Sequence, residues 1–131
     1  MIAEVEAGEI LRVKRVVAAV DAGQVVNPES LTNQIEGGIV QAISWTLKEQ
    51  VLWDRDRILS RSWESYPILR FDETPEVEVS IVSRPEEPAL GVGECAAGPT
   101  AAAVANALFN AMGVRARYLS LTPDRIARAM E

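Results

Sequence analysis

The pattern of apolar positions predicts a strand and then a long helix in the first third of the chain. Residues 10–20 alternate apolar and basic side chains at first and become continuously apolar from Val16 to Val20. A continuous apolar run of this length is typical of a strand that is covered on both faces. The pair Asn27-Pro28 then predicts a helix start, because asparagine is a favoured N-cap and proline suits the first helical position.

The predicted helix extends to about Gln50 and has one apolar stripe. Gly37 and Gly38 interrupt it, and each glycine costs on the order of 1 kcal/mol relative to alanine inside a helix. A close neighbour is therefore expected at these positions, and another helix, a strand or a ligand would each explain them. Gln34 and Gln41 are most simply a solvated face. The stripe consists of Leu31, Ile35, Ile39, Ala42, Ile43, Thr46 and Leu47.

The middle of the chain predicts a hairpin and a half-buried strand. Two short apolar runs, Val51–Trp53 and Ile58–Ser60, flank a polar tip, as in a hairpin. Glu76–Val82 alternates strictly between apolar and polar residues, which indicates a strand with one buried face. The apolar face of this strand consists of Val77, Val79 and Ile81.

The end of the chain predicts a helix, a short strand and a final helix. The first helix opens at Pro99 or Thr100 and ends near Met112, with Gly113 as a stop signal. Residues 114–118 follow as a short strand, and Thr122-Pro123-Asp124 is expected to cap a helix that reaches the C-terminus. The core stripe of the first of these helices is Val104, Leu108, Ala111 and Met112.

These elements follow one another as strand, helix, hairpin, strand, helix, strand and helix. The order predicts a mixed α/β arrangement of the α+β class. With 131 residues, the chain forms a single domain or one segment of a larger one. A chain of this length buries roughly two thirds of the surface that it exposes when unfolded.

Composition narrows the chemistry that the chain can carry. Its net charge of −6 argues against a nucleic-acid or anionic membrane surface, which needs clustered lysine and arginine, and no apolar run reaches the length of a membrane span. Histidine is absent, which excludes Ser/His/Asp and Cys/His catalysis. The single cysteine, Cys95, allows no internal disulfide. The cysteine count therefore gives no indication of compartment, and the chain is expected to be soluble in either the cytoplasm or the periplasm.

The segment Gly91–Pro99 is the leading candidate for function. Glycines at 91 and 93 immediately precede Glu94, so a tightly shaped loop could present this carboxylate to a ligand. The simpler interpretation is a turn that leaves Glu94 near a helix N-terminus, where a carboxylate is favourable in any case. The local pattern alone favours the simpler interpretation.

Three separated segments resemble one enzyme family when they are taken together. They are Val20–Pro28, the Asn-Gln-Ile-Glu-Gly-Gly-Ile-Val-Gln-Ala run at 33–42, and Gly91–Glu94. The chain resembles, from about Val13 to Ala127, the C-terminal part of the large molybdopterin-binding subunit of the xanthine dehydrogenase and aldehyde oxidase family. Within that family it looks most like the isoquinoline 1-oxidoreductase beta subunit.

The resemblance implies a role for each matching residue. Glu94 corresponds to the base that takes a proton from water or hydroxide on molybdenum. Gln34 corresponds to a contact with the pterin, Gly37 and Gly38 let the helix backbone approach it, and Gly93 belongs to the same cofactor site. No residue of this chain is expected to ligate the metal. Because burial beside apolar groups raises a carboxylate pKa towards the working pH of a general base, the apolar residues around Glu94 are expected to form a pocket for it.

The family's reaction implies partners for this chain. The substrate is a small N-heterocycle or an aldehyde, the oxygen comes from water, and the electrons leave through iron–sulfur clusters on another domain or subunit. Family subunits run to several hundred residues, so residues 1–131 are expected to be a C-terminal segment that needs an upstream remainder. The alternative is a catalytically inactive fragment that acts as a structural module and associates with itself.

One position departs from the family pattern. Cys95 stands where the family usually has proline, which leaves Glu94 in place. Cys95 is interpreted as a small buried apolar residue rather than as a metal ligand or a nucleophile.

Overall fold

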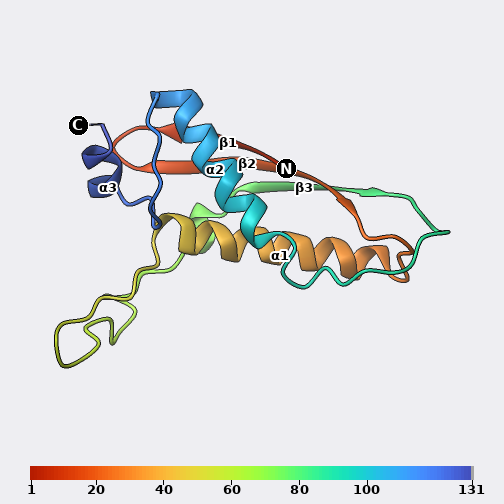
Figure 1. The fold of residues 1–131 in the computed structure, drawn as a ribbon, viewed down its shortest axis with the longest axis horizontal. Coiled ribbons are helices and arrows are strands. Elements are labelled where there is room, and N and C mark those ends of the chain that lie inside the picture. Colours follow the sequence, from red (N-terminus) through yellow and green to blue (C-terminus); the bar gives the residue numbers. More distant parts are fainter. Residues whose placement is uncertain (131) are drawn as a thin grey trace.

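The computed structural model describes residues 1–130 and consists of a three-stranded sheet with two helices against it (Figure 1). This arrangement confirms the predicted mixed α+β class. The elements in chain order are β1 (Ile2–Ala7), β2 (Leu11–Asp21), α1 (Pro28–Leu47), the 3-10 turn η1 (Phe71–Glu73), β3 (Glu76–Val82), α2 (Ala97–Met112) and α3 (Pro123–Arg128).

The sheet has the order β1-β2-β3, with the longest strand in the centre. β1 pairs with β2 in the antiparallel sense, and the register shifts by one residue between Glu4 and Val5. β3 pairs with β2 in the parallel sense, with Val16 opposite Val77 and Val20 opposite Ile81. Parallel neighbours need a crossover connection, and α1 lies within that connection.

The core lies between one face of the sheet and the two long helices. Val16 and Ala18 of β2 are buried on this face, and Val77 and Val79 of β3 pack against the same cluster. Burial of this apolar surface is the main force that holds the two layers together. The remaining buried side chains of the core include Leu31, Ile35, Ile39, Ile43, Val104 and Leu108.

The opposite face of the sheet is open, so the predicted double coverage of 16–20 is wrong for the described residues. Ala19 is exposed there, Arg15 pairs with Glu78, and Lys14 lies 3.6 Å from Glu6. The run from Val16 to Val20 is continuously apolar for a different reason. Its side chains alternate between the two faces of the sheet: Val16 and Ala18 face the core, and Val17 and Ala19 lie on the open face beside the charged pairs.

Helix α1 confirms its predicted start and its predicted stripe. Asn27 is the N-cap, and its Oδ1 accepts a hydrogen bond of 2.9 Å from the backbone N–H of Ser30. All seven predicted stripe positions are buried. The helix ends at Leu47, three residues before the predicted end, and the Lys48 N–H bonds the Ser44 carbonyl there.

Two predictions about short strands are corrected. The hairpin at 51–60 is a single antiparallel bridge between Trp53 and Ile58, and residues 114–118 form no strand. An isolated two-stranded pair is marginal without a third strand or a packed face, and residues 114–118 have no pairing neighbour among residues 1–130. Strand β1, which the sequence analysis did not predict, supplies the third strand of the sheet instead.

Helix boundaries near the C-terminus also differ from prediction. α2 starts at Ala97, before the expected Pro99, and ends at Met112 as predicted, with Gly113 as its C-cap at a φ of 72°. Its last turn extends beyond the sheet, so Ala111 and Met112 are exposed (Figure 1). α3 ends at Arg128, and Thr122 makes no side-chain capping bond.

No helix in the part of the chain that the structure describes is long and apolar enough to cross a bilayer.

Candidate functional site

Glu94 lies in the loop just before α2, three residues ahead of Ala97. Its backbone carbonyl accepts a hydrogen bond of 3.1 Å from the Ala97 N–H, so it belongs to the turn that starts the helix. The side chain is exposed and makes no hydrogen bond or ion pair with residues 1–130, and no side chain caps α2. The carboxylate is therefore near the helix N-terminus without acting as its cap, which leaves both oxygens available to a ligand.

A hydrogen bond joins the two predicted motifs directly. Gln34 Nε2, on α1, donates to the carbonyl oxygen of Gly93 at 3.1 Å, although the two residues are 59 positions apart in the sequence. Gln34 is exposed but not merely solvated, because its amide fixes the loop that carries Glu94. The structure thus brings Gln34, Gly93 and Glu94 to one place.

The two glycines of α1 have different surroundings. A Cβ built on Gly38 would lie 3.3 Å from Cβ of Ala96, so Gly38 lets the start of α2 approach α1. A Cβ on Gly37 would meet nothing within 4 Å. Packing against the described residues therefore does not require a glycine at position 37. The backbone of Gly37 faces open space one turn away from Gln34.

A second contact, which the sequence analysis did not identify, holds the other end of the loop. Gly23 has a φ of 64°, and a Cβ there would lie 2.1 Å from the carbonyl oxygen of Pro88. The Leu90 N–H donates to the Ala22 carbonyl at 3.0 Å, and the Gln24 N–H donates to the Glu87 carbonyl at 2.9 Å. The Asp-Ala-Gly turn after β2 was the available signal, since only glycine adopts this conformation and permits this approach readily.

An apolar cavity of about 360 Å³ lies beside the loop, but Glu94 does not line it. The expected burial of the carboxylate in an apolar pocket is therefore wrong for residues 1–130. Cys95 is exposed and lines the cavity, whereas Ala96 is the buried residue of this turn, so the interpretation of Cys95 as buried is also corrected. The other lining residues come from β2, α1 and the loop, and they include Ala18, Val20, Ile35, Leu90 and Val92.

The residues around Gln34 fit a ligand that is bound through hydrogen bonds and backbone contact. Gln34 offers an amide, and the positions of Gly37 and Gly93 are free of side chains and open. Among the described residues, no three side chains of the metal-binding types are grouped to hold a metal ion. What this surface offers a ligand is therefore one side-chain amide and open backbone at Gly37 and Gly93.

The sequence model of a protein family described as the molybdopterin cofactor-binding domain matches residues 3–75. The chain belongs to this family. The matched region contains Gln34, Gly37 and Gly38 and ends before Gly93 and Glu94. The match therefore covers helix α1 and leaves the loop that carries Glu94 outside.

Relatives of this molybdopterin cofactor-binding chain extend the similarity over nearly its whole length. A nicotinate dehydrogenase subunit of Pseudomonas putida is 46% identical over 94% of this chain and 10% of its own length. The beta subunit of isoquinoline 1-oxidoreductase from Brevundimonas diminuta is 34% identical over 86% of this chain and 14% of its own length. The predicted family is confirmed, and similarity is higher to the nicotinate enzyme than to the isoquinoline enzyme.

A solved structure shows the same fold. Quinoline 2-oxidoreductase from Pseudomonas putida superposes with a TM-score of 0.81 at 30% identity, over 92% of this chain and 16% of that chain. This chain thus spans between a tenth and a sixth of the length of these three proteins.

Proposed function

We propose that this chain is the C-terminal segment of a molybdenum hydroxylase and that Glu94 is its catalytic base. The enzyme oxidises a small N-heterocycle or aldehyde with oxygen taken from water. An upstream remainder of the subunit supplies most of the cofactor contacts, and iron–sulfur clusters on a partner subunit or domain receive the electrons. The chain alone lacks activity in this proposal.

The hydrogen bond between Gln34 and Gly93 is the observation that carries the proposal. Family membership assigns α1 to a cofactor-binding domain, and this bond ties α1 to the residue next to Glu94. A base must lie within hydrogen-bond distance of the proton that it takes, so in this proposal the loop that carries Glu94 lies at the bound cofactor. The contact supports a single site built from both segments.

Each residue of the site has a defined task. The carboxylate of Glu94 takes a proton from the water that supplies the oxygen, and its lack of partners among residues 1–130 leaves it able to accept one. Gln34 holds the loop and presents its amide oxygen to the cofactor, while Gly37 leaves backbone accessible. The bound molybdenum cofactor supplies the redox centre that takes up the two electrons released when the substrate gains a hydroxyl group.

Similarity to the nicotinate dehydrogenase of Pseudomonas putida supports an N-heterocycle as the first substrate class to test. The names of the isoquinoline and quinoline enzymes indicate the same class. An aldehyde remains the second class, and the two are separated by supplying nicotinate, quinoline and benzaldehyde to the same preparation.

The test is reconstitution of the chain with the upstream part of the subunit, the cofactor and the iron–sulfur partner. Substrate oxidation is followed with an artificial electron acceptor, and bound molybdenum is measured by elemental analysis. Glu94→Gln is expected to reduce turnover by at least about a hundredfold, as expected for loss of a general base, while bound molybdenum is unchanged. Glu86→Gln is the matched control, because it alters an exposed carboxylate eight residues away.

The variant Gly37→Ala separates cofactor binding from folding. Gly37→Ala adds a methyl group in open space, so the cofactor-free chain should keep its stability or gain up to about 1 kcal/mol. Bound molybdenum should nevertheless fall in the assembly. Turnover that survives Glu94→Gln contradicts the assignment of the base. A preparation that stays free of metal and self-associates instead of joining the upstream part supports the inactive-module alternative.

A further inference from the structure

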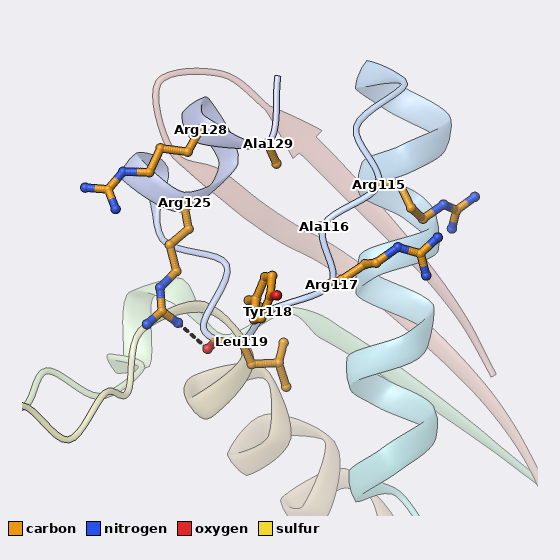
Figure 2. Close-up of a pocket in the computed structure, with 8 residues that line it drawn as sticks. All are labelled: Arg115, Ala116, Arg117, Tyr118, Leu119, Arg125, Arg128 and Ala129. Atoms are coloured by element: carbon orange, nitrogen blue, oxygen red, sulfur yellow. Dashed lines mark hydrogen bonds between the residues drawn. The ribbon is translucent and has the colours of Figure 1, made fainter. Parts of the chain in front are cut away.

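A second cavity lies at the opposite end of α2 from Glu94 (Figure 2). Its volume is about 500 Å³, and it lies between the segment that follows α2 and the helix α3. None of its residues belongs to the site around Gln34 and Glu94. Its lining consists of Arg115, Ala116, Arg117, Tyr118, Leu119, Arg125, Arg128 and Ala129.

The first wall of this cavity is a strand-like segment without a partner strand. Along residues 114–117 the side chains alternate, with Val114 buried, Arg115 exposed, Ala116 half-buried and Arg117 exposed. Among residues 1–130, no backbone N–H or carbonyl of 114–118 forms a hydrogen bond with another group of the protein. An unpaired backbone of this kind is a template to which an extended segment can add as a strand.

The four arginines of the cavity come from two segments, with Arg115 and Arg117 on the segment after α2 and Arg125 and Arg128 on α3. In Figure 2, Arg115 and Arg117 project to one side and Arg128 to the other, Arg125 turns toward the Leu119 carbonyl, and Tyr118 lies between Arg117 and Arg125. Arg115 is held by a hydrogen bond of 3.0 Å to Asn106 Oδ1 and by stacking on Phe109, with 3.7 Å between Cζ and the ring centroid. Arg125 donates to the Leu119 carbonyl.

Because these side chains diverge, they do not converge on one small anion. A ligand that contacts both rows must be elongated, and it must present negative charge at several points along its length. The exposed ring of Tyr118 and the half-buried Ala116 add apolar contact between the rows.

The charge of this region is opposite to that of the rest of the chain. Residues 114–130 contain four arginines and one carboxylate, Asp124, and so carry +3. The whole chain has 13 basic and 19 acidic residues, which leaves 9 and 18, or −9, for the other residues. No carboxylate of residues 1–130 forms a salt bridge with any of these four arginines. Within residues 1–130, the positive charge of these arginines is therefore not neutralised by an ion pair.

We infer that residues 114–118 bind an extended acidic segment of the upstream remainder of the subunit, which adds to them as a β-strand. Carboxylates at alternate positions of that segment face Arg115 and Arg117, and its remaining polar groups pair with the free backbone. This inference rests on the proposed function, because that proposal places the chain in a longer subunit. The length of the relatives, of which this chain spans as little as 10%, supplies ample polypeptide for such a segment.

The first test uses the full 131-residue chain and a fluorescent peptide of sequence TEVEVEVT. Fluorescence anisotropy at low salt should show saturable binding, and added salt should weaken it by screening. Arg117→Glu combined with Arg128→Glu should weaken binding at least about tenfold, because both rows then repel the peptide. Neither side chain forms a hydrogen bond or a salt bridge with residues 1–130, so folding should be unchanged, which circular dichroism verifies.

Matched controls separate strand addition from simple charge attraction. Arg55→Glu combined with Arg61→Glu makes the same change of charge on exposed side chains elsewhere and should leave binding intact apart from the small long-range effect of charge. A peptide with the same glutamates but N-methylated at alternate amides should lose binding, because it keeps the charge and lacks the donors. Equal binding by the methylated peptide, or none by TEVEVEVT, overturns the inference.

The source of the segment is tested by hydrogen–deuterium exchange at residues 115–118. These amides should exchange rapidly in the isolated chain and become protected when the upstream part of the subunit is added. Native mass spectrometry checks the competing occupant, since a dimer that the Arg117→Glu/Arg128→Glu variant dissociates would assign the surface to a second copy and overturn the inference. Glu94→Gln should bind the peptide normally, so failure of the proposed catalytic role is distinguishable from failure of this one.

Discussion

Helix α1 and the arm, defined as residues 51–71, have comparable apolar content and opposite burial. Eight of the 20 residues of α1 are apolar, as are ten of the 21 residues of the arm. Six of the eight are buried in α1, whereas no residue of the arm is buried, and Trp53 and Phe71 are 72% and 98% exposed. Apolar content therefore does not decide burial in this chain.

The difference lies in the backbone. The residues of α1 satisfy their own hydrogen bonds and place their apolar side chains on one stripe that faces the sheet. The arm has a single β-bridge, and most of it extends away from the two layers, whereas Leu69 near its end packs against the core (Figure 1). Its apolar residues have no regular element to align them. The accessible surface of 8969 Å² accordingly exceeds the roughly 6,800 Å² expected for a compact protein of 14.3 kDa.

Ile39→Ala should give the largest effect, because it removes packing from the body, which we define as the sheet and the helices α1 and α2. Ile39 is fully buried at the centre of the α1 stripe, so its truncation should reduce the free energy of unfolding by about 2–5 kcal/mol. Chemical denaturation followed by circular dichroism measures this change. Ile58→Ala is the matched substitution in the arm, and an equal loss there would contradict the comparison.

Gly23→Ala should give the next largest effect, because Gly23 lies where the turn after β2 contacts the loop that leads to Glu94. The methyl group would meet the Pro88 carbonyl at a backbone angle that alanine disfavours, so we expect a loss of at least about 1–2 kcal/mol. Hydrogen exchange should also rise at Gln24 and Leu90, whose N–H groups donate to the Glu87 and Ala22 carbonyls across this contact. Gly8→Ala serves as the control, since a Cβ there meets nothing within 4 Å.

The ion pair at the base of the arm should contribute less. Lys48 Nζ lies 2.5 Å from Glu73 Oε2, and both side chains are mostly buried. Burial raises the pKa of Glu73, but the hydrogen bonds from Lys48 and from the Arg70 backbone outweigh it and hold the pKa below its ordinary value of 4.5. Lys48→Met should remove about 1 kcal/mol of stability at pH 7.

The pH dependence of this pair follows from the direction of the pKa shift. Because the folded pKa is depressed, the stabilisation is present above the unfolded value and is lost as the pH falls through the folded value. Denaturation curves of the wild type and of Lys48→Met should therefore converge below about pH 4.5. A difference that persists at pH 2 would assign the effect to packing of the lysine stem instead.

Trp53→Ala should give the smallest effect. The indole is exposed and its segment is outside the core, so stability should change by no more than about 0.5 kcal/mol. Thermal unfolding with Ile39→Ala in parallel provides the comparison. A loss of several kcal/mol would mean that the arm packs on the body in solution.

The sequence predicts the elements that have strong local signals. The cap at Asn27, the stripe of α1 and the alternation of β3 are each determined by residues close in the chain, and all three are confirmed. The strand predicted at 114–118 is wrong, and the hairpin predicted at 51–60 is reduced to one antiparallel bridge between Trp53 and Ile58. A strand depends on a partner that periodicity does not reveal. β1 was missed because its alternation of small apolar and acidic residues is a weak signal.

The candidate site was predicted in part. Motif resemblance named Gln34, Gly93 and Glu94, and the structure brings them together. The sequence predicts a turn at Gly23, but the contact of this turn with the loop was not predicted, because the partner is the backbone of Pro88, 65 positions away. The roles of Glu94 and Gln34 in catalysis and cofactor binding stay predictions.

The position of the arm in the chain has a consequence for how the protein can be divided. β1, β2 and α1 precede the arm, whereas β3, α2 and α3 follow it, yet β2 and β3 are adjacent in the sheet. A tryptic nick at Arg55 or Arg57 would therefore separate two fragments that still share one ladder and one core. Such fragments should remain associated after cleavage and should reassemble when produced as separate polypeptides.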